Sequence, residues 1–372
     1  MLAALEESRA ALGQTSPNPA VGAVVVRDGR IVGRGRTQPP GASEGGPHAE
    51  VMALRDAGHA ARGAEVYVTL EPCSHHGRTP PCTDALIAAG VAAVHLSIED
   101  PDPRVSGAGI RALQAAGIRV TEGDGADEAA RINEGFLKHR RTGLPFILAK
   151  FAASLDGRIA AGSGDGEPIS GAEAHAWSHD LRTRIDTIIV GSNTVVMDDP
   201  QLTARPGGAL AARQPLRVVI DGVGRVTPFS RVFDTAARTL VATTAASGEA
   251  WRAALAQHGV EVAVLPSTDG RHVDLGALMR LLGERELLTV LVEGGGELLG
   301  ACFDQRYVDR LYAVIAPVIV GATNAPTAVA GRGAMTMREA PRLGDLVVTR
   351  LGEDVLIEGV PIWVDPPASD EG

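Results

Sequence analysis

The chain has 372 residues, of which 45% are apolar and 22% charged, and its formal net charge at pH 7 is −10. This length predicts two domains with ample cores. The acidic balance disfavours binding to nucleic acids, because nonspecific polyanion binding needs a basic surface. We see no signal peptide and no apolar run long enough to span a bilayer, so we expect no membrane association. Three cysteines are too few for a disulfide framework and favour a reducing compartment, the cytoplasm.

Helices and strands are predicted to alternate along the first 141 residues. Asp28-Gly29 separates two apolar runs and indicates a hairpin. Alternation of this kind predicts a layered α/β sheet with functional side chains at the strand ends. The expected helices cover residues 2–12, 48–57, 83–89, 106–116 and 126–141, and the expected strands cover residues 21–26, 30–35, 65–70, 91–98 and 118–121.

A second α/β domain is predicted after a linker at residues 141–145. We therefore place the domains at residues 1–143 and 144–364, followed by a disordered tail at 365–372. The expected strands of the second domain cover residues 146–152, 187–190, 216–221, 239–243, 262–265, 288–293 and 309–316, and its expected helices cover 249–258, 275–282 and 297–303, with a further helix carrying Arg182.

The pattern His48-Ala49-Glu50, followed by Pro72-Cys73 and Pro81-Cys82, predicts a catalytic zinc site. One imidazole and two thiolates leave the fourth position of a tetrahedral zinc open for water. Zinc would lower the pKa of that water, and Glu50 could carry protons between water and leaving group. The pattern is that of zinc-dependent nucleobase deaminases, although eight residues rather than two separate the cysteines. Because residues two apart diverge on a helix, His48 must lie at a helix start.

A second group of residues predicts an anion site in the second domain. Gly294-Gly295-Gly296 follows a strand and opens a helix, where backbone N–H groups can hold a phosphate. By itself this turn is weak evidence, since such turns are common without a ligand, and it is not a Rossmann fingerprint. Lys150, Arg182 and Arg205 could neutralise a substrate phosphate, with bidentate arginine contacts fixing its geometry.

Taken in order, these runs closely resemble the bifunctional riboflavin-biosynthesis deaminase/reductases of bacteria. The resemblance rests on Pro17-Asn18-Pro19-Ala20-Val21-Gly22, on Pro47 to Glu50, on the run from Val68 to Cys82 with its His-His-Gly-Arg-Thr-Pro-Pro insertion, and on Gly135-Phe136-Leu137, Lys150 to Arg158, Asp198 to Thr203 and Glu293-Gly294-Gly295. It implies a cytidine-deaminase-like three-layer α/β/α domain followed by a dihydrofolate-reductase-like α/β domain. It also implies Zn²⁺ and NADPH as cofactors, a phosphorylated pyrimidine as small-molecule substrate, and a homo-oligomer.

The resemblance further implies roles for individual positions. His48, Cys73 and Cys82 would bind zinc, and Glu50 and Lys150 would be catalytic. The substrate positions are Asn18, His76 and Arg78 in the deaminase and Gly166, Arg182, Leu202, Arg205 and Glu293 in the reductase, and the cofactor positions are Ala152, Pro168, Thr194, Asp198, Gly295 and Gly296.

Departures from the family pattern leave alternatives open. Pro168 stands where the family usually has a Trp, Gly166 replaces a Ser, and Thr37 replaces a His. Because Pro168 stands where a Trp would line the cofactor site, a deaminase carrying a degenerate, non-catalytic reductase domain is one alternative. A deaminase of nucleic-acid bases would need a basic groove with stacking aromatics, but aromatics are only 3% of the chain. A non-enzymatic, metal-stabilised scaffold would need Glu50 as a fourth zinc ligand, whereas deaminase signatures leave that residue unligated.

Overall fold

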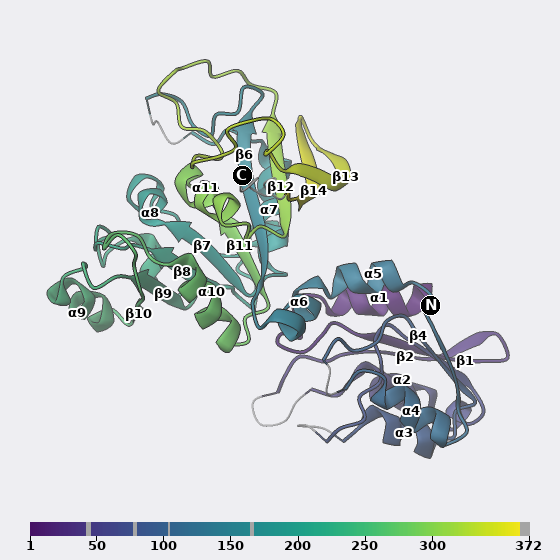
Figure 1. Ribbon diagram of the computed structural model, residues 1–372. Helices are drawn as coiled ribbons and strands as arrows, with labels where there is room; N and C mark the ends of the chain where they lie inside the picture. The colour runs from purple at the N-terminus through teal and green to yellow at the C-terminus, as the bar shows by residue number, and fades with distance from the viewer. Residues whose placement is uncertain (42–45, 77–79, 103–104, 164–166, 365–372) are drawn as a thin grey trace, which may run out of the picture. The chain divides into compact units, whose positions relative to one another are not determined.

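The computed structural model describes residues 1–41, 46–76, 80–102, 105–163 and 167–364. The chain divides into two compact units, each with its own sheet (Figure 1). Unit 1 contains Met1–Leu144 together with Glu286–Leu288, and unit 2 contains Pro145–Arg285 and the residues from Thr289 onward. Arg78, Gly166 and the expected tail at residues 365–372 lie outside the described residues.

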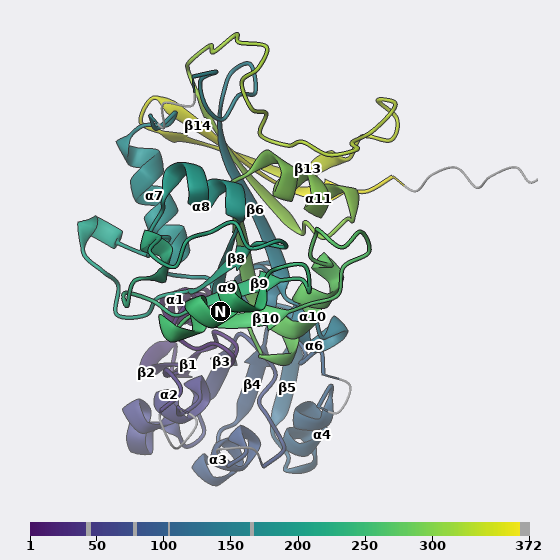
Figure 2. The same cartoon turned by 90° about the vertical axis from the view of Figure 1, so that its left-hand side faces the viewer.

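Unit 1 is built on a five-stranded sheet in the order β2-β1-β3-β4-β5 (Figure 2). The strands are β1 (Gly22–Arg27), β2 (Arg30–Arg36), β3 (Glu65–Val68), β4 (Ala93–Leu96) and β5 (Arg119–Glu122). β1 pairs antiparallel with β2 and β3, and β3, β4 and β5 run parallel. Asp28 and Gly29 adopt φ of 51° and 72°, as a tight hairpin turn requires, so the predicted hairpin is confirmed.

Helices cover both faces of this sheet, which confirms the three-layer prediction (Figure 1). One face carries α1 (Leu2–Ala11) and α5 (Ala126–Ile132), and the other carries α2 (Ala49–Ala57), α3 (Cys82–Ala89) and α4 (Ala108–Ala115). A 3-10 turn, Gly58–Ala61, follows α2. Glycines allow the layers to approach closely. A Cβ on Gly22 would lie 1.9 Å from the carbonyl oxygen of Ala4 in α1, and one on Gly35 would lie 2.3 Å from that of Ala49 in α2.

The prediction of one helix over residues 126–141 is wrong, because the helix is interrupted at Asn133, which separates α5 from α6 (Glu134–Thr142). Asn133 has φ −107° and ψ 18°, outside the helical range. Its buried side chain accepts a hydrogen bond from the main-chain N–H of Ala20 (2.8 Å) and donates one to the carbonyl of Ala20 (3.0 Å). These bonds satisfy the main-chain groups of Ala20, in the loop that precedes β1, and the helix between residues 126 and 142 is interrupted where Asn133 makes them.

Unit 2 contains a nine-stranded sheet in the order β10-β9-β8-β7-β11-β6-β12-β14-β13. The seven strands from β10 to β12 are parallel, and β14 and β13 pair antiparallel beyond them. The strands are β6 (Phe146–Ser154), β7 (Thr187–Gly191), β8 (Leu216–Ile220), β9 (Thr239–Thr243), β10 (Glu261–Val264), β11 (Thr289–Glu293), β12 (Arg310–Ala316), β13 (Arg342–Leu351) and β14 (Asp354–Ile362).

The helices of unit 2 connect the parallel strands, as the alternating pattern predicts. They are α7 (Ala172–Arg182), α8 (Ser192–Asp198), α9 (Glu249–Gln257), α10 (Leu275–Glu284) and α11 (Gly296–Asp304), with 3-10 turns at Pro206–Gly208 and Arg231–Phe233. Each predicted strand lies within two residues of an observed one. Sequence analysis missed β13 and β14, and most of β13 is exposed, so the alternation of buried and exposed residues that marks a half-buried strand is absent there.

Candidate active sites

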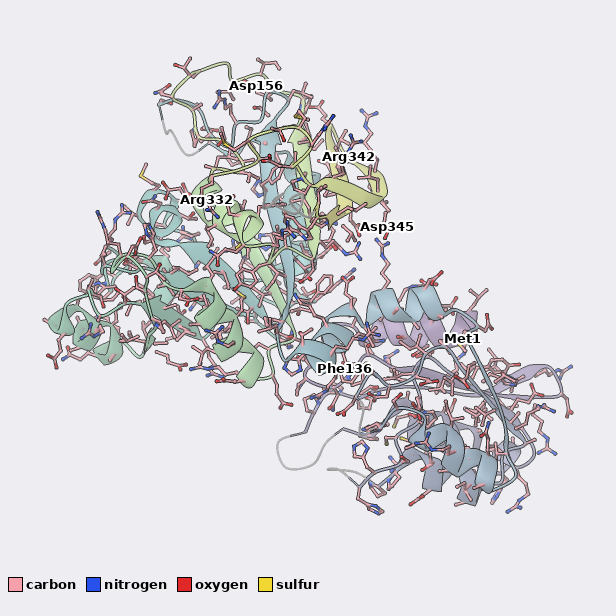
Figure 3. The ribbon with its side chains drawn as sticks, in the orientation of Figure 1. Met1, Phe136, Asp156, Arg332, Arg342 and Asp345 are labelled. Atoms are coloured by element: carbon pink, nitrogen blue, oxygen red, sulfur yellow. The ribbon has the colours of Figure 1, made fainter. Side chains whose placement is uncertain are left out.

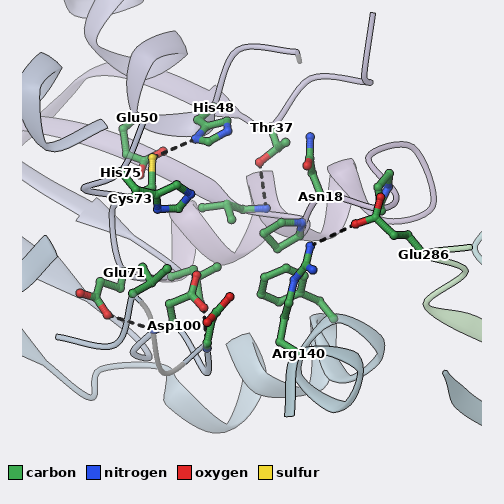
Figure 4. A pocket seen from close by; sticks show the side chains of 17 residues that line it. Asn18, Thr37, His48, Glu50, Glu71, Cys73, His75, Asp100, Arg140 and Glu286 are labelled. Atoms are coloured by element: carbon green, nitrogen blue, oxygen red, sulfur yellow. Dashed lines mark hydrogen bonds and ion pairs between the residues drawn. The ribbon is translucent and has the colours of Figure 1, made fainter. Parts of the chain in front are cut away.

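The three predicted zinc ligands converge in unit 1, and Figure 4 shows two of them, His48 and Cys73. His48 is the N-cap of α2, as its helix-start position requires, Cys73 lies in the loop after β3, and Cys82 is the first residue of α3. His48 Nδ1 lies 3.2 Å from Cys82 Sγ and 3.5 Å from Cys73 Sγ, and all three donor atoms lie within 4.8 Å of one another. Zinc bonds of about 2.0 Å to nitrogen and 2.3 Å to sulfur at tetrahedral angles separate the two donors by roughly 3.6 Å. The cluster therefore fits a zinc ion.

The local electrostatics favour a deprotonated sulfur, the form that binds metal. The Cys82 thiol donates to Cys73, and this bond, with a further one from His48, lowers the pKa of Cys73 to about 4. The same bond raises the pKa of Cys82. The main-chain N–H of Cys82, at the start of α3, also donates to Cys73 Sγ at 3.3 Å.

Glu50 lies beside the cluster without belonging to it. It is the second residue of α2 and is only 4% exposed. Burial, and next the negative charge of Cys73, raise the pKa of Glu50 to about 7, against an opposing effect of His48. A carboxyl group with a pKa near neutrality can both accept and release a proton at physiological pH.

The cluster opens into a cavity of about 320 Å³ in unit 1, a volume suited to a small molecule (Figure 4). Asn18 lines it, as do Thr37 and His75. His76, the expected substrate residue, is exposed and is not among the lining residues. Sequence reasoning assigned no role to four further lining residues: Asp100, Asp102, Phe136 and Arg140. Asp100 and Asp102 follow β4, so their position at the carboxyl end of a strand was the available signal.

Glu71 is a buried residue that organises one wall of this cavity, and sequence reasoning also missed it. Its Oε2 accepts main-chain hydrogen bonds from Asp100 (3.1 Å) and Gly107 (3.0 Å), and its Oε1 accepts from Gly109 (2.8 Å) and Ile110 (3.3 Å). The carboxylate thus ties the loop after β4 and the start of α4 to the Cys73 turn. The available signal was an acidic residue two positions before an expected zinc ligand.

In unit 2 the structure brings Lys150, Arg182 and Glu293 together. Lys150 on β6 and Glu293 on β11 are register partners on adjacent parallel strands. Lys150 Nζ lies 3.0 Å from Glu293 Oε1, and Arg182, the last residue of α7, lies 2.9 Å from Glu293 Oε2. Burial alone would raise the pKa of Glu293, but Arg182 and Lys150 outweigh it and lower that pKa to about 2. The carboxylate is therefore ionised between two cations.

Arg205 joins this group through His179 of α7. The main-chain N–H of Arg205 lies 3.2 Å from His179 Nδ1, and Arg182 donates to the carbonyl of Thr203 at 3.1 Å. Burial, together with the charges of Arg182 and Arg205, lowers the pKa of His179. Leu202 is buried with φ 53°, a region that side-chain-bearing residues rarely adopt.

The glycine turn lies at the end of β11. Gly294 and Gly295 have φ of 97° and 77°, and α11 begins at Gly296. The side chain of Thr194 packs against both glycines, since a Cβ on Gly294 or on Gly295 would lie 3.4–3.5 Å from Thr194 Oγ1. The other expected cofactor positions are Asp198 at the end of α8, whose pKa burial raises, Ala152 on β6, and exposed Pro168.

Asp156, labelled in Figure 3, follows the end of β6, and its hydrogen bonds connect it to the loop after β12. Its carboxylate accepts main-chain hydrogen bonds from Val320 (3.0 Å) and Gly321 (2.8 Å) and a third from the hydroxyl of Ser154. These bonds lower the pKa of Asp156. Asp156 belongs to the run from Lys150 to Arg158, but the sequence pattern predicted no role for it.

Both units match known protein families. Residues 1–98 match the cytidine and deoxycytidylate deaminase zinc-binding region, and residues 145–357 match the RibD C-terminal domain. The chain is 43% identical over 355 residues to the riboflavin biosynthesis protein RibD of Escherichia coli K12, covering 92% of this chain and 93% of that protein. The chain belongs to the RibD family. The RibD protein of Bacillus amyloliquefaciens is 39% identical over 362 residues, covering 97% and 95%.

Solved RibD structures share the fold. Acinetobacter baumannii RibD superposes with a TM-score of 0.83 at 34% identity, covering 96% of this chain and 97% of that chain. A diaminohydroxyphosphoribosylaminopyrimidine deaminase/5-amino-6-(5-phosphoribosylamino)uracil reductase from Thermotoga maritima gives 0.81 at 33% identity, with the same coverage.

RibD proteins are bifunctional deaminase/reductases of riboflavin biosynthesis, and this member has both the deaminase and the reductase domain. The prediction of a bifunctional enzyme is therefore confirmed over that of a deaminase with a degenerate reductase domain. No helix within the described ranges is both long and apolar enough to cross a membrane.

Proposed function

We propose that this enzyme deaminates 2,5-diamino-6-(5-phosphoribosylamino)pyrimidin-4(3H)-one and then reduces its ribosyl chain with NADPH, to give 5-amino-6-(5-phosphoribitylamino)uracil. Residues 1–143 would carry the first reaction and residues 144–364 the second, in the cytoplasm. The observation that carries the proposal is the His48, Cys73 and Cys82 cluster, which opens into a cavity beside Glu50, a residue outside the cluster.

In the deaminase site, His48, Cys73 and Cys82 would hold zinc, which supplies Lewis-acid activation of water. Glu50 would accept a proton from the attacking water and deliver it to the amino group that leaves as ammonia. Its burial excludes bulk water, which would otherwise compete for that proton. Asn18 lines the cavity and would orient the pyrimidine ring, while Glu71 fixes the loop after β4 and the start of α4 through its four main-chain bonds.

In the reductase site, bound NADPH would supply the reducing equivalents. The main-chain N–H groups at the start of α11, where the Gly295-Gly296 turn leads into the helix, would hold its phosphates. Thr194 packs beside this turn. Lys150 is fixed by Glu293 and would donate a hydrogen bond to the ribosyl chain, and Arg182 and Arg205 would bind the substrate phosphate.

The test follows ammonia release and NADPH oxidation in parallel on purified, zinc-loaded protein given the diaminopyrimidine substrate. We expect ammonia release first and NADPH consumption after it. Removing zinc with a chelator should stop ammonia release but leave reduction of the already deaminated uracil compound intact. Ammonia release without NADPH oxidation at any cofactor concentration would refute the reductase assignment, and would point to Pro168 as the reason.

A further inference from the structure

We propose that Gln201 is a positioning residue for substrate binding, whose neutral amide aims the Arg205 guanidinium without cancelling its charge. The inference rests on the proposed function, because it assigns Arg205 to the substrate phosphate. It concerns a side chain to which the sequence patterns gave no role.

The cations of the reductase site are held in two different ways. Arg182 and Lys150 share the carboxylate of Glu293, so those three groups together carry one net positive charge. Arg205 makes no ion pair within the described part of the chain, and its Nη1 instead donates to Gln201 Oε1 at 2.6 Å. An amide oxygen gives direction to a guanidinium but leaves its full charge to attract an anion.

The orientation of the Gln201 amide is fixed by its other contacts. Its Nε2 donates to Asp234 Oδ2 at 3.2 Å, so its Oε1 must face Arg205. Asp234 is held at 2.7 Å by Arg217, whose side chain is fully buried. Arg217 also donates to the main-chain carbonyl of Gln201 at 3.2 Å, which fixes the backbone at this residue as well.

The main chain around Arg205 is held just as firmly. His179 Nδ1 receives the Arg205 N–H, and the side chain of Gln214 bonds both the N–H (2.7 Å) and the carbonyl (2.9 Å) of Ala204. The guanidinium of Arg205 lies at the end of a long side chain, and these main-chain bonds do not orient it. The hydrogen bond to Gln201 Oε1 does. Such preorganisation reduces the entropy lost when a phosphate binds.

The test uses full-length Gln201→Met, which keeps the length of the side chain but removes the acceptor, and Gln201→Glu, which keeps an acceptor but adds a negative charge. Gln257→Met, at the exposed end of α9, makes the same chemical change at a residue that takes no part in these contacts. NADPH oxidation is measured with 5-amino-6-(5-phosphoribosylamino)uracil and with its dephosphorylated ribosyl counterpart.

For Gln201→Met we expect the KM of the phosphorylated substrate to rise about tenfold, the scale of one hydrogen bond to a charged group, with kcat nearly unchanged. Gln201→Glu should raise that KM further, since its carboxylate neutralises Arg205 and repels the phosphate. Both variants should match wild type on the dephosphorylated substrate, on ammonia release and in the KM of NADPH, and Gln257→Met should match it throughout. An equal loss on both substrates would show a general structural role and overturn the proposal.

Equilibrium binding of the phosphorylated ribityl product, measured without NADPH, separates this inference from the proposed function. Wild type that binds the product but does not oxidise NADPH would overturn the proposed reduction alone. Gln201→Met that binds the product as tightly as wild type would overturn the positioning role of Gln201, whatever the turnover.

Discussion

Replacement of Glu293 by Gln tests whether the buried charge group of unit 2 depends on an ionised carboxylate. The pKa of Glu293 is about 2 in the folded protein, against an ordinary value of 4.5. At about 1.4 kcal/mol per pKa unit, ionisation of this group adds about 3 kcal/mol to the free energy of unfolding at pH 7. Little of that is lost to solvent screening, because the side chains of Lys150, Arg182 and Glu293 are 12–14% exposed. Gln mimics the protonated form, so Glu293→Gln should lose about this amount and leave two cations without a counter-charge.

The sign of the pH dependence follows from the lowered pKa. The contribution of Glu293 is fully present above pH 4.5 and is lost as the pH falls from 4.5 towards 2. Wild type should therefore lose about 3 kcal/mol more than Glu293→Gln over that interval, and the two proteins should converge in stability at its acid end.

Tryptophan fluorescence during urea unfolding is a suitable assay, because the three tryptophans, Trp177, Trp251 and Trp363, all lie in unit 2. With a urea dependence of about 1–3 kcal/mol per molar, the midpoint at pH 7 should fall by roughly 1–3 M. Glu353→Gln, at an exposed position, is the matched control and should leave the midpoint within error. Equal midpoints and equal pH slopes for Glu293→Gln and wild type would refute the reasoning.

Three further substitutions divide the two activities. Glu50→Gln should abolish ammonia release while leaving the zinc content, measured by elemental analysis, unchanged; loss of zinc would show Glu50 to be a ligand. Lys150→Ala should lower the rate of NADPH oxidation at least tenfold without affecting ammonia release, and an equal loss of both activities would undo the division into two sites. In Glu71→Gln, whichever way the amide is oriented, its NH₂ group faces two main-chain N–H donors and cannot accept their hydrogen bonds. We therefore expect kcat/KM for ammonia release to fall about tenfold, with zinc retained. Unaltered kinetics for Glu71→Gln would show that the loop after β4 keeps its position without the carboxylate.

The parts of the sites that could be predicted are those whose chemistry is local in sequence. Two thiols beside prolines and a His-x-Glu run indicate zinc because few other arrangements use those residue types together. The requirement that His48 begin a helix followed from helix geometry, and the structure confirms it. The glycine turn was predictable for the same reason, since the positive φ of Gly294 and Gly295 belongs to a strand–turn–helix pattern.

The parts that escaped prediction depend on contacts between residues distant in sequence. Glu71 binds main-chain groups 29 to 39 residues further along the chain, and Asn133 interrupts a helix to bond a residue 113 positions earlier. Arg217 was indistinguishable from the other arginines until the fold buried it against Asp234. Such buried polar partnerships are decided by topology, which the local pattern of residues does not encode.

Asn133 also sets a limit on how the deaminase can be separated as a module. The match to the deaminase zinc-binding region ends at residue 98, yet Phe136 and Arg140 of α6 also line the cavity. Asn133 holds Ala20, which lies two residues after Asn18 in the loop that precedes β1. A fragment cut at residue 98 would keep every metal ligand but lose strand β5 and part of its binding surface. An excised domain that is to bind substrate, or be fused to another protein, therefore has to extend at least to the end of α6 at Thr142.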